Sequence, residues 1–323
     1  MAKSGENTPL RVSADPGYRK ALVPAACRPI TGASGRSQET AGRFLAVLVL
    51  CLLAGCTPER KMASEETEAA GLLERAGGRL RTESIASNDF LVSVIGIDFS
   101  DVHVRDADLA PVLKMPYVRT VALRGTKVTD AGLAVFKDCQ YLEMVDLSHT
   151  AVSGTGLRDL HYSVIKDLNL ADSNFGDRGT ADLVEVGHHL LRLNLAGTKV
   201  TDEGLERLQR LRALESLDLS RTRIFGTGLR YLPAGLKELN LSGASIINAN
   251  LVHLERLNLL ERLNLSGTNV TDDAIPHVQA MVEAQNQKAG RRKFIYLNLR
   301  KTAVSDEVAV LLQKSVPGLT IER

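Results

Sequence analysis

The sequence predicts an α/β solenoid, a fold in which short parallel strands line one face and short helices line the other. Two observations predict it. An apolar pattern returns every 22 to 25 residues over most of the chain, and the 44% hydrophobic content is mostly aliphatic, since 4% of the residues are aromatic and none is Trp. Self-similarity at such a period is typical of repeat proteins, in which each unit packs against its neighbours.

Apolar residues recur at fixed positions in each repeat. The middle residues of the expected strands are Ile97, Val121, Val145, Leu168, Leu193, Leu217, Leu239, Leu263, Leu297 and Leu319. An apolar residue also stands three positions before each of them and seven positions after each of the first nine. We therefore expect about ten short parallel strands whose middle residue points inward, each followed by a short helical segment.

The clearest copy spans residues 190–208 and reads LLRLNLAGTKVTDEGLERL. On this pattern the sequence resembles the leucine-rich repeat family over residues 91–323. Its "VTDxGLxxL" half is similar to the subtype shared by ribonuclease-inhibitor-like and F-box-associated repeats. The resemblance implies an α/β horseshoe with the strands on the concave face and the short helices on the convex face.

Polar residues recur where the helical segments begin. Asp130, Asp202, Asp272 and Asp306 are expected to accept a backbone N–H there and to face the positive end of the segment. Glycines recur two residues further on and are expected to let neighbouring repeats approach closely. They are Gly132, Gly156, Gly179, Gly204 and Gly228.

Three segments depart from the regular repeat. Residues 279–292 lengthen one unit and are expected to extend a convex helix. Residues 63–80 are a candidate amphipathic helix that serves as a tether or cap. The last strand is expected at Leu319–Ile321 and leaves an open sheet edge, which suggests self-association through this strand.

The N-terminal region has the pattern of a targeting segment. Residues 44–55 are twelve apolar residues behind Arg43, too few to span a bilayer, which needs about 20. The run ends in Leu53-Ala54-Gly55-Cys56, which resembles a bacterial lipobox. That resemblance implies a lipid on Cys56 and attachment to a membrane of the cell envelope, with the outer membrane favoured if the cell has two.

The domain organisation follows from these segments. Residues 1–43 are expected to be a disordered extension, 44–55 the hydrophobic region of a signal peptide, 56–90 a tether with an N-terminal helical cap, and 91–323 the repeat domain. Residues 1–55 hold seven basic and three acidic residues, so the net charge of +2 for the whole chain becomes −2 without them. A near-neutral body argues against nucleic acid as a partner.

The outward positions of the strands form the expected binding surface. The position after each middle residue is mostly Asn or Asp, and this column is interpreted as architectural. The position before it varies more and includes Arg192, Glu238, Arg262 and Tyr296. These residues are a candidate docking patch for a protein, which Arg300 and Lys301 extend. Ion pairing between adjacent strands, such as Asp167 with Arg192 and Glu238 with Arg262, is the alternative interpretation.

No catalytic, cofactor or metal site is expected. The sequence has no nucleophile elbow, P-loop or dinucleotide fingerprint, and His253 and His277 are interpreted as structural or exposed. The favoured function is a membrane-anchored, non-catalytic protein-binding module of the bacterial cell envelope. The alternatives are a self-assembling envelope protein and an F-box-like ubiquitin-ligase adaptor.

Overall fold

The computed structural model describes residues 62–85, 92–286 and 294–323. The chain divides into two compact units, Met1–Pro58 and Glu59–Arg323, and all of the described residues belong to the second. The predictions for the extension, for the hydrophobic region and for Cys56 therefore lie outside the described residues.

The second unit contains one eleven-stranded sheet whose strands follow the order of the chain. The strands β2 to β11 are parallel, and β1 pairs antiparallel with β2. The strands are β1 Arg79–Ser84, β2 Val92–Asp98, β3 Thr120–Ala122, β4 Met144–Asp146, β5 Asp167–Asn169, β6 Arg192–Asn194, β7 Ser216–Asp218, β8 Glu238–Asn240, β9 Arg262–Asn264, β10 Tyr296–Asn298 and β11 Thr320–Glu322.

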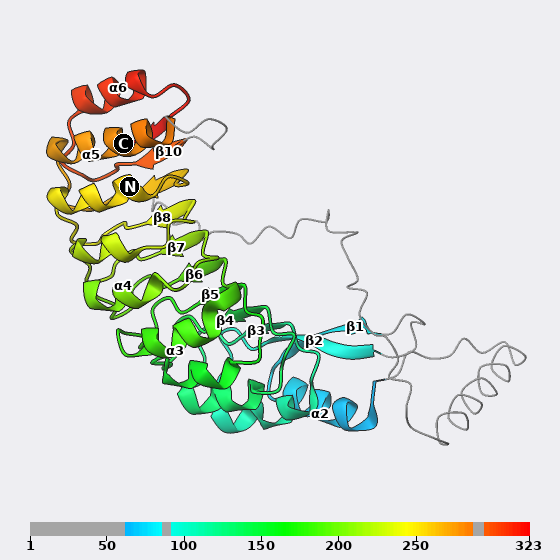
Figure 1. Ribbon diagram of the computed structural model, residues 1–323. Helices are drawn as coiled ribbons and strands as arrows, with labels where there is room; N and C mark the ends of the chain where they lie inside the picture. Colours follow the sequence, from blue (N-terminus) through cyan, green and yellow to red (C-terminus); the bar gives the residue numbers. More distant parts are fainter. Residues whose placement is uncertain (1–61, 86–91, 287–293) are drawn as a thin grey trace, which may run out of the picture. The chain divides into compact units, whose positions relative to one another are not determined.

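Helical segments connect consecutive parallel strands and cover the other side of the unit (Figure 1). The α-helices are α2 Ser64–Arg75, α3 Gly179–Val186, α4 Asp202–Leu208, α5 Ile275–Asn286 and α6 Asp306–Ser315. The 3-10 helices are η1 Asp106–Lys114, η2 Asp130–Phe136, η3 Thr155–Leu160, η4 Gly187–His189, η5 Thr227–Tyr231, η6 Asn248–Arg256 and η7 Asp272–Ala274. The predicted leucine-rich repeat solenoid is confirmed.

The predicted apolar columns form the core. Val145 pairs with Val121 on one side and with Leu168 on the other, so the middle residues of adjacent strands lie next to one another. These residues join one continuous buried cluster that runs from Ala69 to Leu319. Because no single repeat buries its own apolar stripe, each repeat depends on its neighbours for stability.

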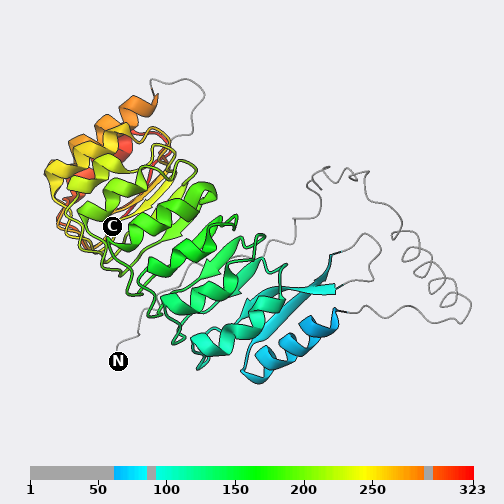
Figure 2. The ribbon, with the colours of Figure 1, turned by 60° about the horizontal axis from the view of Figure 1, so that its bottom comes forward.

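The N-terminal helix is shorter than expected. The helix α2 ends at Arg75, and Gly77, with φ of 94°, reverses the chain. The amide of Gly78 donates to the carbonyl of Leu73 and the amide of Gly77 to that of Glu74, which is the hydrogen-bond pattern of a Schellman cap. Residues 79 and 80 therefore belong to β1, which lies beside α2 and β2 in Figure 2.

The last strand lies one residue later than expected. Ile321, and not Leu319, pairs with Leu297, so the final repeat interval is 24 residues. Leu319 is buried ahead of the strand. The prediction of a final strand at Leu319–Ile321 was wrong because two apolar residues, the buried Leu319 and the partly buried Ile321, both fit the central position.

The aspartates at the helix starts act between repeats. The cap of η2 is Thr129, whose hydroxyl accepts the amide of Ala131. The carboxylate of Asp130 instead accepts hydrogen bonds from Ser153 and Gly154 of the following repeat. Asp130, Asp202 and Asp272 accept backbone N–H groups, as expected, but these groups belong to the following repeat, because the side chains point along the stack.

The repeated glycines sit where this contact needs them. A Cβ on Gly156 would lie 2.4 Å from the backbone oxygen of Asp130, and one on Gly204 would lie 2.3 Å from Oδ1 of Asp177. Both distances are shorter than any real carbon contact. The expected role of this glycine column in close packing between repeats is confirmed.

The long unit extends a helix, as expected. The helix α5 has 12 residues, more than the other segments between the parallel strands, and ends at Asn286, next to residues 287–293, which are not described. The amide of Gln285, buried in this helix, donates to the carbonyl oxygens of Leu257 and Leu260. None of the helices within the described ranges is long and apolar enough to cross a membrane.

Candidate functional site

The outward position before each middle residue forms a row across the sheet. Strand pairing places its members side by side in this order: Gly96, Thr120, Met144, Asp167, Arg192, Ser216, Glu238, Arg262, Tyr296 and Thr320. We call this row the outward row. Its side chains are exposed or half-buried from Thr120 to Thr320, whereas those of the middle residues are buried from Ile97 to Leu297 and partly buried at Ile321.

Three of the predicted binding residues lie on adjacent strands. The guanidinium carbon of Arg262 on β9 lies 4.3 Å from the ring centroid of Tyr296 on β10. Its Nε lies 3.9 Å from Oε1 of Glu238 on β8. The exposed arginine is therefore held between an aromatic face, a contact that contributes about 0.5–1 kcal/mol at exposed sites, and a carboxylate, where an exposed ion pair contributes about 0–1 kcal/mol.

The tyrosine of this group is neutral and anchored. Its side chain is half-buried, and its hydroxyl oxygen accepts a 3.4 Å hydrogen bond from the amide of Asn298. Partial burial and the neighbouring Glu322 carboxylate raise the pKa of Tyr296 above its ordinary value. The ring presents an apolar face and a polar tip, as aromatic anchors of protein interfaces do.

Of the other predicted residues, Arg192 lies apart from this group, whereas Arg300 pairs with Glu322, which neighbours Tyr296. Arg192 lies on β6, where its Nε is 2.8 Å from Oδ2 of Asp167. Arg300 follows β10, and its Nε is 3.7 Å from Oε2 of Glu322. The structure thus brings Glu238, Arg262 and Tyr296 together and leaves Arg192 two strands away, in the ion pair that the alternative interpretation describes.

The column of Asn and Asp residues after the middle position is architectural, as expected. Its side-chain oxygens accept the backbone N–H two residues later, at 2.8–3.1 Å. The residues that do so are Asp98, Asp146, Asn169, Asn194, Asp218, Asn240, Asn264 and Asn298. These side chains shape the turn after each strand, so one side-chain oxygen of each is bound to the backbone.

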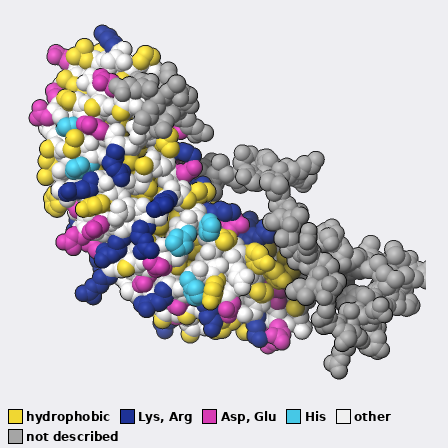
Figure 3. Space-filling model, in the orientation of Figure 1, with side chains coloured by type: hydrophobic (Ala, Val, Ile, Leu, Met, Phe, Trp, Pro, Cys, Tyr) yellow, Lys and Arg dark blue, Asp and Glu magenta, His cyan; other side chains and the backbone are white. Residues whose placement is uncertain are grey.

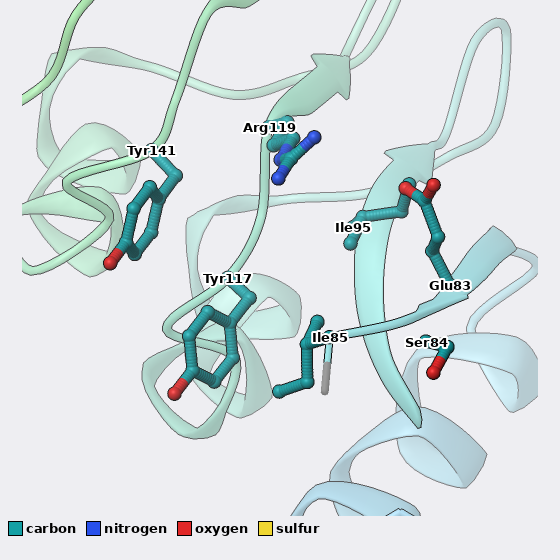
Figure 4. Close-up of a pocket in the computed structure, with 7 residues that line it drawn as sticks. All are labelled: Glu83, Ser84, Ile85, Ile95, Tyr117, Arg119 and Tyr141. Atoms are coloured by element: carbon teal, nitrogen blue, oxygen red, sulfur yellow. The ribbon is translucent and has the colours of Figure 1, made fainter. Parts of the chain in front are cut away.

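An aromatic hollow lies near the first strands and was not anticipated from the sequence. Its volume is about 250 Å³, and Figure 4 shows the residues that line it: Glu83, Ser84, Ile85, Ile95, Tyr117, Arg119 and Tyr141. The rings of Tyr117 and Tyr141 are stacked, with centroids 5.8 Å apart. Both tyrosines stand four positions before a middle residue, so they occupy equivalent positions in neighbouring repeats. Alignment of the repeats could therefore have indicated that the two rings lie side by side.

The face with this hollow carries apolar and imidazole groups. In Figure 3 hydrophobic side chains gather near β1 and β2, and histidine side chains lie between them and the middle of the unit. Tyr162, the most exposed of the large hydrophobic residues that the structure describes, contacts His161, with ring centroids 3.8 Å apart and the rings tilted by 45°. Exposed tyrosines at this density suit contact with a protein rather than with solvent alone.

The described ionisable groups include a buried thiol and several histidines. No group of three or more metal-ligating side chains comes together in the part of the chain that the structure describes. Burial, and then the charge of Asp138, raise the pKa of the Cys139 thiol to about 11, so it stays protonated at neutral pH and is a poor nucleophile. Nδ1 of His277 lies 3.2 Å from Oε1 of Glu255.

Comparison with known proteins agrees with the geometry. A family model described as a leucine-rich repeat matches residues 188–208. The sequence matches none of the curated proteins with which it was compared. An internalin from Listeria monocytogenes has a similar structure, with a TM-score of 0.52 and 17% identity over 69% of this chain and 58% of the internalin chain.

Two further solved structures are more distant. One is a chain in an octameric complex of latrophilin 3, Unc5D and FLRT2, with a TM-score of 0.47 and 18% identity over 68% of this chain and 65% of that one. The other is a leucine-rich repeat protein of Leptospira interrogans, with a TM-score of 0.46 and 17% identity over 66% and 56%. The chain spans less than two thirds of the length of each of these three proteins.

Proposed function

We propose that this leucine-rich repeat solenoid is a non-catalytic module that binds a protein through its strand face. One observation carries the proposal. Arg262 is exposed on the outward row and is held between the Tyr296 ring and the Glu238 carboxylate. An arginine stacked on tyrosine presents large contact area at a low cost in side-chain entropy, and both residue types are enriched among those that dominate binding energy.

A crosslinking experiment in the native cell tests this patch. In one variant a photoreactive amino acid replaces Ser216, the outward-row neighbour of Glu238. In a second variant of the same protein it replaces Glu206 on the helical face. We expect one discrete adduct from position 216 and none from position 206. The double variant Arg262→Glu/Tyr296→Ala should lower the yield at least tenfold, with unchanged thermal unfolding.

An adduct of equal yield in the double variant would remove Arg262 and Tyr296 from the binding surface. An adduct of equal yield from position 206 would show that the contact is not specific to the strand face. Either outcome contradicts the proposal, because the patch then contributes nothing to partner choice.

We also propose that the module is a lipoprotein of the bacterial cell envelope, attached through Cys56. The support is the twelve-residue apolar run that ends in Leu53-Ala54-Gly55-Cys56, behind a basic residue. The intact mass of the N-terminal peptide from membrane extracts, beside a Cys56→Ser control, tests it. A peptide that begins at Cys56 and carries two or three acyl chains is expected. An unmodified peptide from upstream of residue 44 would contradict it.

Self-association through the sheet edge is a second candidate function. The strand β11 is the last in the described sheet and pairs there with β10 alone. Because the amide of Thr320 donates toward β10, that of Ile321 points to the open edge. Sedimentation that depends on protein concentration, and that Ile321→Pro abolishes, would support it. A monomer at every concentration would exclude it.

A further inference from the structure

The turns that follow the parallel strands form a second charged row. The carboxyl ends of parallel strands meet at one edge of a sheet, so the residues that follow them lie together. Backbone hydrogen bonds continue across these turns: Arg221 donates to Ser242, Gly243 to Ser266, and Gly267 to Arg300, each at 2.8 Å. The side chains of successive turns are therefore held in a fixed order along this edge.

One position in each turn has a left-handed backbone. It stands four residues after the middle residue, and φ lies between 54° and 70° in all nine turns. Four turns place glycine there, and five place a charged or ionisable residue: Asp101, His149, Asp172, Arg221 and Lys301. Glycine adopts this conformation without strain, whereas arginine and lysine do not. Strain of this kind concentrates at functional sites.

The turns after β6 to β10 are basic. They span residues 195–199, 219–223, 241–245, 265–269 and 299–303, and they contain five basic residues and no acidic one. Arg221 pairs with Asp172 of an earlier turn at 2.9 Å, and Lys199 donates to Asn174. No ion pair holds the exposed side chains of Arg223 and Lys301 within the described residues, so these two cations are available.

Two turns with glycine at the left-handed position separate the two available cations. The turns after β8 and β9 have glycine at the left-handed position, Gly243 and Gly267. A Cβ on Gly267 would meet only the backbone of Gly243, at 3.8 Å or more. Three strand spacings separate the turn of Arg223 from that of Lys301, or about 14 Å. Because glycine has no side chain, a bound peptide can lie close to the backbone here, between the side chains of Arg223 and Lys301.

We propose that this edge binds an acidic segment of a protein, which lies over Gly243 and Gly267 and pairs with Arg223 and Lys301. Charge complementarity carries the choice of occupant. An anionic lipid surface fits less well, because Asp101 and Asp172 stand in the same row and would face that surface too. The inference deepens the proposed function, since it rests on a protein as the partner and names its chemistry.

Fluorescence anisotropy with a labelled peptide of ten glutamates tests the edge on the full chain. The variant Arg223→Glu/Lys301→Glu should weaken peptide binding at least tenfold. The matched control is Arg124→Glu/Lys127→Glu, which makes the same charge change in the turn after β3 and should leave the affinity within twofold. Circular dichroism and thermal unfolding verify that both variants fold.

Each other outcome overturns the edge site. Equal weakening in the two variants would mean that only net charge attracts the peptide. Unchanged peptide binding, together with loss of binding to phosphatidylglycerol vesicles in the first variant alone, would assign the edge to a membrane. Loss of binding only in Arg262→Glu/Tyr296→Ala would move the acidic segment to the strand face.

The two proposals fail separately. An adduct at position 216 that depends on Arg262, without any binding of the glutamate peptide, would keep the strand-face function and remove the edge. Peptide binding that depends on Lys301, without a strand-face adduct, would keep the edge and remove the patch.

Discussion

The carboxylate of Asp130 provides the sharpest test of how the repeats are joined. Its Oδ2 accepts hydrogen bonds from the amide and the hydroxyl of Ser153, at 2.9 and 2.7 Å. Its Oδ1 accepts the amides of Gly154 and Gly156, both at 2.9 Å. All four donors belong to the following repeat, so one ionised side chain satisfies the start of its neighbour's helical segment.

The substitution Asp130→Asn should lower the free energy of unfolding by about 2–4 kcal/mol. An amide has one acceptor oxygen, so two of the four donors lose their partner and face an NH₂ group instead. Hydrogen bonds to a charged group contribute about 1.5–3 kcal/mol each, and an unsatisfied donor costs about 1–3 kcal/mol. The side chain is only half-buried, so water recovers part of the loss.

Asp146→Asn is the matched control. Its oxygen accepts one backbone hydrogen bond, from the amide of Ser148, and Asn169 makes the equivalent bond in the next repeat. An asparagine keeps that acceptor, so the control should change stability by less than about 0.5 kcal/mol. Urea unfolding at pH 7, followed by circular dichroism, gives both values. Equal destabilisation by the two substitutions would refute the inter-repeat role of Asp130.

The dependence on pH adds an independent check. Burial of Asp130 opposes ionisation, but hydrogen bonds from Gly156, Ser153 and Gly154 outweigh it and lower the pKa of the carboxyl. A carboxyl whose pKa is lower in the folded state stabilises the fold above its ordinary pKa of about 4 and loses that contribution as the pH falls through the lowered value. The stability gap between the native protein and Asp130→Asn should therefore be constant from pH 6 to 8 and shrink below about pH 4. A gap that persists in acid would refute the reasoning.

Three further changes test the packing, each by urea or thermal unfolding. Gly156→Ala places a Cβ 2.4 Å from a backbone oxygen and should cost about 1–3 kcal/mol, whereas Gly176→Ala, with its nearest atom at 3.5 Å, should cost less than about 1 kcal/mol; equal costs would contradict the tight contact. Lys301→Gly removes left-handed strain at φ of 56° and should raise stability by about 0.5–1 kcal/mol, while Lys127→Gly, which relieves no such strain, should lower it; a loss in both would contradict the strain. Leu193→Asp puts an unpaired charge in a side chain that is 2% exposed and should abolish cooperative unfolding; a preserved transition would contradict the register.

The fold was predictable because the buried side chains of each repeat are apolar and recur at a regular spacing in the sequence. Val145, Leu193 and Leu263 are middle residues whose strand partners follow directly from the aligned columns, and the structure pairs them so. The strand β1 was missed because Arg79–Ser84 reads RLRTES, with one apolar residue, and its pairing with β2 depends on backbone hydrogen bonds and on the ion pair between Arg79 and Asp98. A strand that buries few apolar side chains leaves no periodic apolar pattern in the sequence.

The candidate site was predictable only in part. Glu238, Arg262 and Tyr296 follow from strand order, because neighbouring repeats place equivalent positions side by side. The stacking of Arg262 on Tyr296 depends on side-chain torsions that repeat alignment does not contain. The repeat that Asp130 contacts could not be predicted for a related reason, since the sequence shows where a helical segment starts but not along which direction the carboxylate points.

The positions that repeat identically and those that vary carry different kinds of information in this solenoid. The amide-binding oxygen of Asn194 and the glycine at 204 are tied to backbone contacts that every repeat needs, so their recurrence follows from the fold. The left-handed turn position is different, because its positive φ favours glycine. Gly243 and Gly267 adopt this conformation without strain. Lys301 raises the energy of the same turn and has no ion pair within the described residues, whereas Arg221 pairs with Asp172. A charged residue that the fold would do better without is a stronger sign of binding than a polar residue that the fold requires, and this contrast is why the basic edge, and not the asparagine column, is the surface to mutate first.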